Sequence, residues 1–272
     1  MLGGPLTCAI SLLLGAGDVY APWAVPRELE FPFDDAHLLF QGQSNGGKLF
    51  RTHGLPTDGT AVPLVVFIHG MTIDGALHHW LTPDPNGPWD ARAFMGAMVD
   101  EGKVAPHVVA APSQTLDADN PEKLFVGLDF DAFVAAVDLA LAPVQKVDRT
   151  KVFVLGNSAG ACYPGAASFR ALEAKTFTPF ALFAVDGCMS KEGGELLAKT
   201  TTVKNVIVTY QDWAWTERSF EEFRWAWASN VALGEKAGQR ILEKHGFSSE
   251  NLHLELVEFT MRRFMPKLLP PP

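Results

Sequence analysis

One serine lies between two glycines in the run Gly156-Asn157-Ser158-Ala159-Gly160, and its surroundings could make it a nucleophile. Residues 151–155 are strand formers, and the residues that follow the run are small and suit a helix. A serine on such a strand-to-helix turn sits on strained backbone, with its hydroxyl lifted above the sheet. The pattern predicts a nucleophile elbow at Ser158. A phosphate-binding loop is disfavoured, because the run lacks the lysine and the spacing of a P-loop.

Two aspartates follow later strand-like runs and could orient a general base. Asp212 follows "NVIVTYQ", and Asp186 ends "FALFAVD". A carboxylate in either place can hold a histidine in the tautomer that accepts a proton from serine. Each residue could instead serve as an ordinary capping or loop aspartate. We favour Asp212 as the acid and keep Asp186 as the alternative.

The histidine that would act as base is harder to find. The last predicted strand, Leu252–Phe259, is followed by arginines but by no histidine, and arginine stays protonated at ordinary pH. His253 begins that predicted strand, so we expect it at the opposite end of the sheet from Ser158. His78 and His79 lie on the correct side, although a surface or lid role is the simpler interpretation. Without its histidine, such a site keeps only about a thousand- to ten-thousand-fold rate enhancement.

Strand-like and helical runs alternate along the chain, which predicts an α/β fold with a mostly parallel sheet covered by helices on both sides. The predicted strands are 28–33, 37–40, 48–51, 63–69, 107–111, 151–155, 179–186, 204–210 and 252–259. The predicted helices are 91–101, 129–141, 159–174, 194–199 and a long one over 216–245. The first strands should form an antiparallel hairpin at one edge. In such a sheet, ligands bind at the carboxyl ends of the strands.

With "PLVVFIHG" added to these motifs, residues 63–259 resemble the α/β-hydrolase superfamily in motif order and strand spacing. The resemblance implies a serine esterase, with the backbone N–H groups of Met71 and Ala159 as the oxyanion hole and a structural role for His69. Removing one such donor typically costs about two to three orders of magnitude in rate. It implies a small-molecule ester as substrate. A non-catalytic ligand-binding member that lacks the base is the alternative.

Composition restricts the possible partners. The 272 residues are 47% hydrophobic and 19% charged, with a net charge of −9. An acidic chain without a Lys/Arg run does not bind nucleic acid readily, and we expect no nucleic-acid partner, no cofactor and no metal. Acidic residues in two loops could hold calcium, but neither spacing matches an EF-hand. These residues are Asp84, Asp90, Asp117 and Asp119. Nothing in the sequence indicates the oligomeric state.

The chain divides into an apolar segment, residues 1–26, and a single domain over 27–272. The segment resembles the apolar part of a secretory signal but lacks a basic start, and its apolar stretch is too short to span a bilayer. We therefore expect no stable membrane insertion and a secreted or periplasmic protein, with a cytoplasmic one as the alternative.

Cys162 and Cys188 should lie near each other, as a disulfide or as two buried thiols. Trp213 and Trp215 flank Asp212 and could line a substrate pocket.

Overall fold

The computed structural model describes residues 27–33, 46–70, 81, 90–113, 125–142, 144–211, 220–246 and 250–272. Within these residues, eight strands form one sheet in the order β1-β2-β4-β3-β5-β6-β7-β8. The strands are β1 (Glu28–Phe31), β2 (Gly47–Arg51), β3 (Ala61–Ile68), β4 (Val108–Pro112), β5 (Lys146–Asn157), β6 (Ala181–Val185), β7 (Asn205–Tyr210) and β8 (Arg240–Lys244). β1 and β2 pair antiparallel, as does β2 with β4, and the remaining pairs are parallel. The predicted antiparallel edge and parallel centre are confirmed.

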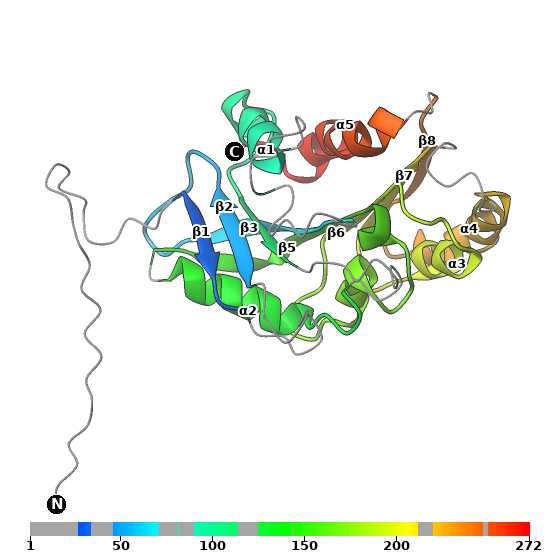
Figure 1. The fold of residues 1–272 in the computed structure, drawn as a ribbon, viewed down its shortest axis with the longest axis horizontal. Coiled ribbons are helices and arrows are strands. Elements are labelled where there is room, and N and C mark those ends of the chain that lie inside the picture. The colour runs from blue at the N-terminus through cyan, green and yellow to red at the C-terminus, as the bar shows by residue number, and fades with distance from the viewer. Residues whose placement is uncertain are drawn as a thin grey trace, which may run out of the picture.

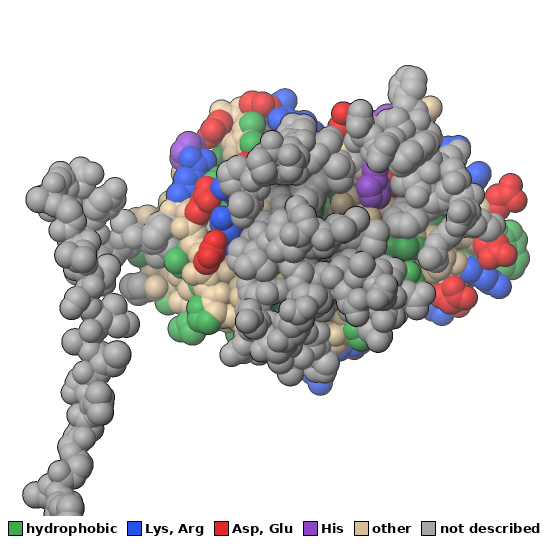
Figure 2. Space-filling view, in the orientation of Figure 1, with side chains coloured by type: hydrophobic (Ala, Val, Ile, Leu, Met, Phe, Trp, Pro, Cys, Tyr) green, Lys and Arg blue, Asp and Glu red, His purple; other side chains and the backbone are tan. Residues whose placement is uncertain are grey.

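Helices cover both faces of this sheet (Figure 1). They are α1 (Ala91–Asp100), α2 (Phe130–Leu141), α3 (Lys191–Lys199), α4 (Phe220–Gly234) and α5 (Glu250–Leu268), with two 3₁₀ helices, η3 (Ser158–Ala161) and η4 (Ala167–Glu173). α1 and α5 lie on one face, and α2, α3 and α4 lie on the other (Figure 1). In the space-filling view, the described acidic and basic side chains on this side of the molecule are mixed in sign (Figure 2).

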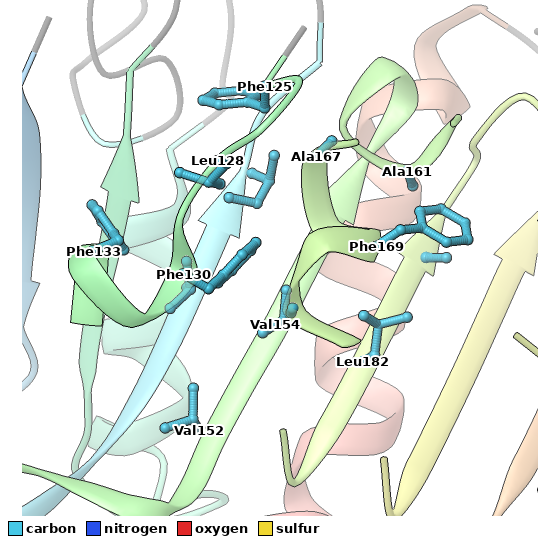
Figure 3. Packing of buried hydrophobic residues seen from close by; sticks show 14 of the residues in the cluster. Phe125, Leu128, Phe130, Phe133, Val152, Val154, Ala161, Ala167, Phe169 and Leu182 are labelled. Atoms are coloured by element: carbon cyan, nitrogen blue, oxygen red, sulfur yellow. The ribbon is translucent and has the colours of Figure 1, made fainter. Parts of the chain in front are cut away.

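The hydrophobic core has two halves, one on each side of the sheet. The central strands are continuously apolar, so alternate residues of β3 and β5 enter opposite halves. Val152 and Val154 pack with Phe130 and Phe133 of α2 in the half that Figure 3 shows. Phe153 packs in the other half, together with residues of α1 and α5. This two-sided burial makes the sheet a rigid support for the loops at its strand ends.

The end of the chain folds differently from the sequence prediction. The predicted helix over 216–245 is wrong: α4 ends at Gly234, and β8 follows. Between them the chain passes so close to the Lys204 carbonyl that a side chain on Gly238 would overlap it. The predicted strand Leu252–Phe259 is also wrong, because these residues belong to α5. The buried side chains of α5 recur at helical three- and four-residue intervals: Leu256, Val257, Thr260, Met261, Phe264 and Met265.

The segment after the Ser158 turn also differs from its prediction. The predicted helix 159–174 is replaced by η3 and η4, separated by a turn that contains Pro164, which disfavours helical backbone in the residue before it. The predicted strand 37–40 lies outside the described residues, as does the whole segment 1–26. Among the helices that the structure describes, none is long and apolar enough to cross a membrane.

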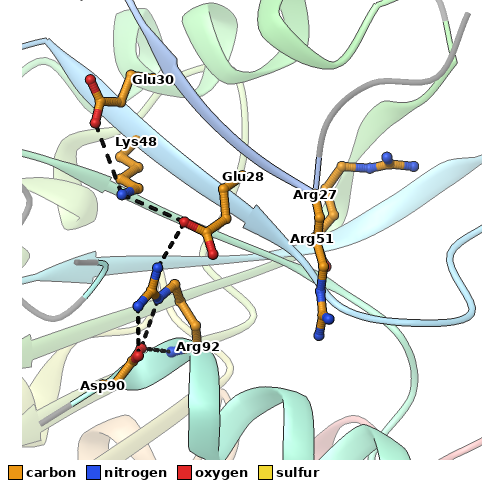
Figure 4. Close-up of polar contacts among 7 residues, drawn as sticks. All are labelled: Arg27, Glu28, Glu30, Lys48, Arg51, Asp90 and Arg92. Carbon is orange, nitrogen blue, oxygen red and sulfur yellow. Dashed lines mark hydrogen bonds and ion pairs between the residues drawn. The ribbon is translucent and has the colours of Figure 1, made fainter. Parts of the chain in front are cut away.

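Polar side chains tie the β1–β2 edge to α1 (Figure 4). Glu28 of β1 contacts Lys48 of β2 at 3.6 Å and Arg92 of α1 at 2.7 Å. Asp90 is the N-cap of α1: it accepts a hydrogen bond from the Arg92 backbone N–H and pairs with its guanidinium. Burial acts to raise the pKa of Asp90, but these bonds and the Arg92 charge outweigh it and leave the pKa below its usual value. This calcium candidate therefore has a structural role; Asp84, Asp117 and Asp119 lie outside the described residues.

Candidate active site

Ser158 is the first residue of η3, directly after the carboxyl end of β5. Its φ is +54°, in the left-handed region that non-glycine residues seldom adopt, and its side chain is nearly buried. A side chain on Gly70, just after β3, would lie 2.7 Å from the Ser158 Cβ. The backbone at Gly70 therefore passes directly against Ser158.

The glycines on either side of Ser158 are required by close backbone contacts. A Cβ on Gly156 would overlap the carbonyl oxygen of Gly160. A Cβ on Gly160 would overlap the Ile68 carbonyl oxygen at the end of β3. The G-x-S-x-G spacing thus lets β5 turn sharply and lets the turn pack against β3.

Asp186 is the described carboxylate that contacts a histidine at this end of the sheet. It follows β6, is fully buried and has a φ of +47°. Its Oδ2 lies 2.6 Å from Nδ1 of His253, whose side chain is 19% exposed. The backbone N–H of Gln211 donates to Oδ1 at 3.1 Å, and Gln211 Nε2 donates to Oδ2 at 2.9 Å.

The prediction that His253 lies at the far end of the sheet is wrong. His253 is in the first turn of α5, and its contact with Asp186 places it at the carboxyl ends of the parallel strands. α5 is fixed there by its buried face and by a hydrogen bond of 2.6 Å between the hydroxyls of Thr260 and Thr209 of β7. His253 therefore follows β8, the last strand that the structure describes.

The contact with Asp186 has a consequence for the imidazole. An ionised carboxylate only accepts hydrogen bonds, so Nδ1 of His253 donates to it and carries the proton of the neutral ring. The other nitrogen, Nε2, is then the basic atom. This is the tautomer that a general base needs when it accepts a proton from a hydroxyl.

A disulfide joins the turn that carries Ser158 to the loop that carries Asp186. It links Cys162, just after η3, to Cys188, two residues beyond Asp186. The two segments also touch through backbone, because a side chain on Gly187 would overlap the carbonyl oxygen of Ala161. Of the two expected states of these cysteines, the structure has the disulfide.

Other predicted site residues divide between described and undescribed parts of the chain. Ala159 is the second residue of η3, and the N–H groups in the first turn of a helix lack an intrahelical acceptor. His69 is fully buried after β3, with Nδ1 donating to the Gly70 carbonyl at 2.7 Å and its ring against Phe125. The remaining ones, Met71, His78, His79, Asp212, Trp213 and Trp215, lie outside the described residues.

The sequence holds a signal for the position of His253 that the strand prediction missed. The run "RILEK" at 240–244 follows two glycines, Gly234 and Gly238, which disfavour a continuous helix. The run contains the adjacent aliphatic residues Ile241 and Leu242. Recognising it as the last strand would have placed His253 after that strand. Residues 252–256 alternate between apolar and polar, which is typical of a strand, so they were predicted as the last strand in place of 240–244.

No protein-family model matches the sequence, and no curated protein matches it in sequence. Solved structures with similar folds include several esterases. A ferulic acid esterase is 14% identical over 82% of this chain and 91% of its own, with a TM-score of 0.50. Esterase 2 of Thermogutta terrifontis, solved in a form phosphonylated by cyclosarin, is 14% identical over 94% of this chain and 100% of its own, with a TM-score of 0.50.

The ferric enterobactin esterase of Salmonella typhimurium is also 14% identical and has a TM-score of 0.53. The match covers 90% of this chain but only 59% of that protein, so the chain spans about three fifths of its length. At such identities the likeness concerns the fold. The strand order, the mixed sheet with helices on both faces and these structural neighbours agree: the chain has the α/β-hydrolase fold.

Proposed function

We propose that the protein is a serine hydrolase that cleaves small carboxylic esters, with Ser158 as nucleophile on an elbow, His253 as base and Asp186 as acid. The observation that carries the proposal is the 2.6 Å contact between His253 Nδ1 and a buried Asp186 carboxylate at the strand ends where Ser158 lies. The left-handed backbone of Ser158 and the glycines that permit it support the nucleophile. Esterases among the structural neighbours support the reaction class.

In the proposed reaction, Ser158 Oγ attacks the ester carbonyl carbon while its proton passes to Nε2 of His253. The carbonyl electron pair moves onto the oxygen, which the N–H groups of Ala159 and Met71 bind as an oxyanion. The tetrahedral intermediate then expels the alcohol, which takes the proton from His253 and leaves an acyl group on Ser158. A water molecule then attacks the acyl carbonyl carbon while one of its protons passes to His253. The second tetrahedral intermediate releases the carboxylic acid, and Ser158 Oγ takes the proton back from His253.

A fluorophosphonate probe tests the nucleophile, because it reacts with an activated serine to form a stable covalent adduct. We expect stoichiometric labelling of the wild-type protein, no labelling of Ser158→Ala and normal labelling of Ser229→Ala. Ser229 is a matched control, since it lies on the exposed side of α4. Hydrolysis of p-nitrophenyl acetate should fall at least about a thousand-fold in Ser158→Ala.

The alternative function is a ligand-binding protein without catalysis. It requires a site without a base, whereas in the structure His253 follows the last described strand, β8. A folded wild-type protein that takes up no probe and hydrolyses no ester would favour this alternative and contradict the hydrolase.

We further propose that the protein works in an oxidising compartment, outside the cytoplasm. The disulfide between Cys162 and Cys188 supports this, since disulfides persist in secreted and periplasmic proteins. Thiol titration of the protein isolated from its native source should detect no reactive thiol at these two positions. Two free thiols there would contradict the proposal.

A further inference from the structure

Gln211 is a fully buried polar residue directly after β7, at the carboxyl end of the sheet. It donates twice to Asp186: from its backbone N–H to Oδ1 at 3.1 Å and from Nε2 to Oδ2 at 2.9 Å. A carboxylate accepts and does not donate, so the amide nitrogen of Gln211 must face it. Both oxygens of Asp186 are therefore held from the neighbouring strand.

The backbone of Asp186 is arranged so that its side chain meets this partner. The Asp186 N–H donates to the Thr209 carbonyl of β7 at 2.8 Å, which continues the sheet pairing by one residue. The φ of +47° then departs from strand geometry. A non-glycine residue adopts this conformation only where its surroundings compensate the strain. Here the two hydrogen bonds from Gln211 and the contact with His253 are available to do so.

Oδ2 of Asp186 is shared by two donors, Gln211 Nε2 and His253 Nδ1. If Gln211 did not hold the carboxylate, Asp186 could rotate about its side-chain bonds and leave the imidazole without a fixed acceptor. Burial adds to the requirement, since a carboxylate removed from water needs hydrogen bonds in its place. The side chain of Gln211 thus acts on the histidine through the acid.

We propose that Gln211 is a positioning residue for the hydrolysis, which orients Asp186 so that His253 keeps its proton on Nδ1 and presents Nε2 to Ser158. This inference rests on the proposed function. In this proposal the neutral amide of Gln211, directly after β7, holds the carboxylate of Asp186, directly after β6.

Gln145 provides a matched control at the other end of the sheet. It is also buried, donates from Nε2 to the Pro56 carbonyl and accepts from Arg51 Nε at 2.9 Å. It precedes β5, whereas Gln211 follows β7. Gln145→Leu therefore removes a comparable set of hydrogen bonds far from the proposed site.

The experiment compares Gln211→Leu and Gln145→Leu with the wild-type protein. In Gln211→Leu we expect kcat for p-nitrophenyl acetate to fall about 10- to 100-fold with little change in KM, since a lost hydrogen bond to a charged group is worth that factor. In Gln145→Leu we expect both constants unchanged. Thermal unfolding should shift to lower temperature in both variants.

Proton NMR gives a readout that does not depend on activity. A histidine N–H bonded to a carboxylate resonates far downfield, so the His253 Nδ1 proton should be visible in the wild-type protein, shifted or lost in Gln211→Leu and unchanged in Gln145→Leu. If Gln211→Leu does not fold, Gln211→Met keeps the length of the side chain and removes the amide donor. It should show the same loss of kcat.

The outcomes separate the two proposals. A wild-type protein without labelling or hydrolysis contradicts the proposed function, whatever the variants do. An active wild type in which the Gln211 variants keep both kcat and the downfield signal shows that Gln211 only stabilises the fold, and overturns this inference.

Discussion

The two ends of the parallel strands are built in different ways, and two histidines illustrate the difference. His107 lies just before β4, at the amino ends, and His253 contacts Asp186 at the carboxyl ends. His107 is fully buried; its Nδ1 donates to the Ala105 carbonyl, and its Nε2 has no hydrogen-bond partner among the described residues. His253 is partly exposed and bonded to a carboxylate. Burial alone therefore does not single out the proposed base; its position in the sheet and its carboxylate partner do.

Backbone strain follows the same division. The described non-glycine residues with positive φ are Phe125, Ser158, Ala167, Asp186 and Met189. Ser158 and Asp186 directly follow strands at the carboxyl ends, and Phe125 lies there against His69. Ala167 is held to Phe125 by a backbone hydrogen bond, and Met189 follows Asp186 closely. Strain of this kind collects where a fold holds a functional site, which is why we assign the chemistry to this end.

The largest expected effect comes from replacing each of the two histidines by glutamine in separate variants. His253→Gln should lower kcat/KM for p-nitrophenyl acetate by about a thousand-fold or more, since it removes the proposed base. His107→Gln should leave kcat/KM within about threefold of the wild type, because the far end of the sheet takes no part in the reaction. Full activity in His253→Gln would remove the distinction between the two ends.

The same assay separates the two candidate acids. Asp186→Asn should cost about as much as the loss of the base, because the amide can no longer hold the histidine in the required tautomer. Asp212→Asn should have a small effect. If the effects are reversed, Asp212 is the acid, as the sequence favoured, and the Asp186 contact is structural.

A smaller effect concerns stability, and it compares a covalent link at the carboxyl ends with an ion pair at the amino ends. Replacing Cys162 and Cys188 together by alanine should lower the free energy of unfolding by about 3 kcal/mol, as expected for a disulfide with a sequence separation of 26. Arg149→Gln, which removes a partly exposed ion pair with Asp138, should cost no more than about 1 kcal/mol. Urea unfolding measures both changes.

Reduction of the wild-type protein provides the control for the cysteine variant. Dithiothreitol should reproduce its loss of stability, and the rate of fluorophosphonate labelling should fall with it, because the disulfide joins the Ser158 turn to the Asp186 loop. Equal stability of the oxidised and reduced proteins would show that backbone contacts alone hold these strained turns.

The fold was largely predictable from the sequence, because strands buried on both faces are continuously apolar and β3, β5 and β7 have that pattern. The proposed nucleophile was predictable because its pattern is local in the sequence: Gly156, Ser158 and Gly160 directly follow an apolar strand. The pairing of Asp186 with His253 was not predictable, because it depends on where β8 and α5 begin. β8 is short and partly exposed, so it lacks the apolar signal of the central strands. The contact of Gln211 with Asp186 joins two strands and leaves no pattern in either one.

The pH dependence of stability tests the structural histidine at the amino end of the sheet. Burial lowers the pKa of His107 to about 4, against a hydrogen bond to the Ala105 carbonyl that acts to raise it. The folded state therefore disfavours the charged ring, and the unfolded state binds more protons as pH falls below its ordinary pKa of about 6.5. The stability that depends on neutral His107 is complete above about pH 6.5 and is lost progressively as pH falls towards 4. The total loss is about 3 kcal/mol.

His107→Gln removes the titrating group and should abolish this part of the pH dependence. Urea unfolding of both proteins at pH 7 and pH 4.5 measures it: the wild type should lose about 2 to 3 kcal/mol more than the variant between the two pH values. NMR titration should show that the His107 ring stays neutral down to about pH 5 in the folded protein. Equal losses in the two proteins would mean that water reaches this ring, and that the amino end of the sheet is less closed than its burial indicates.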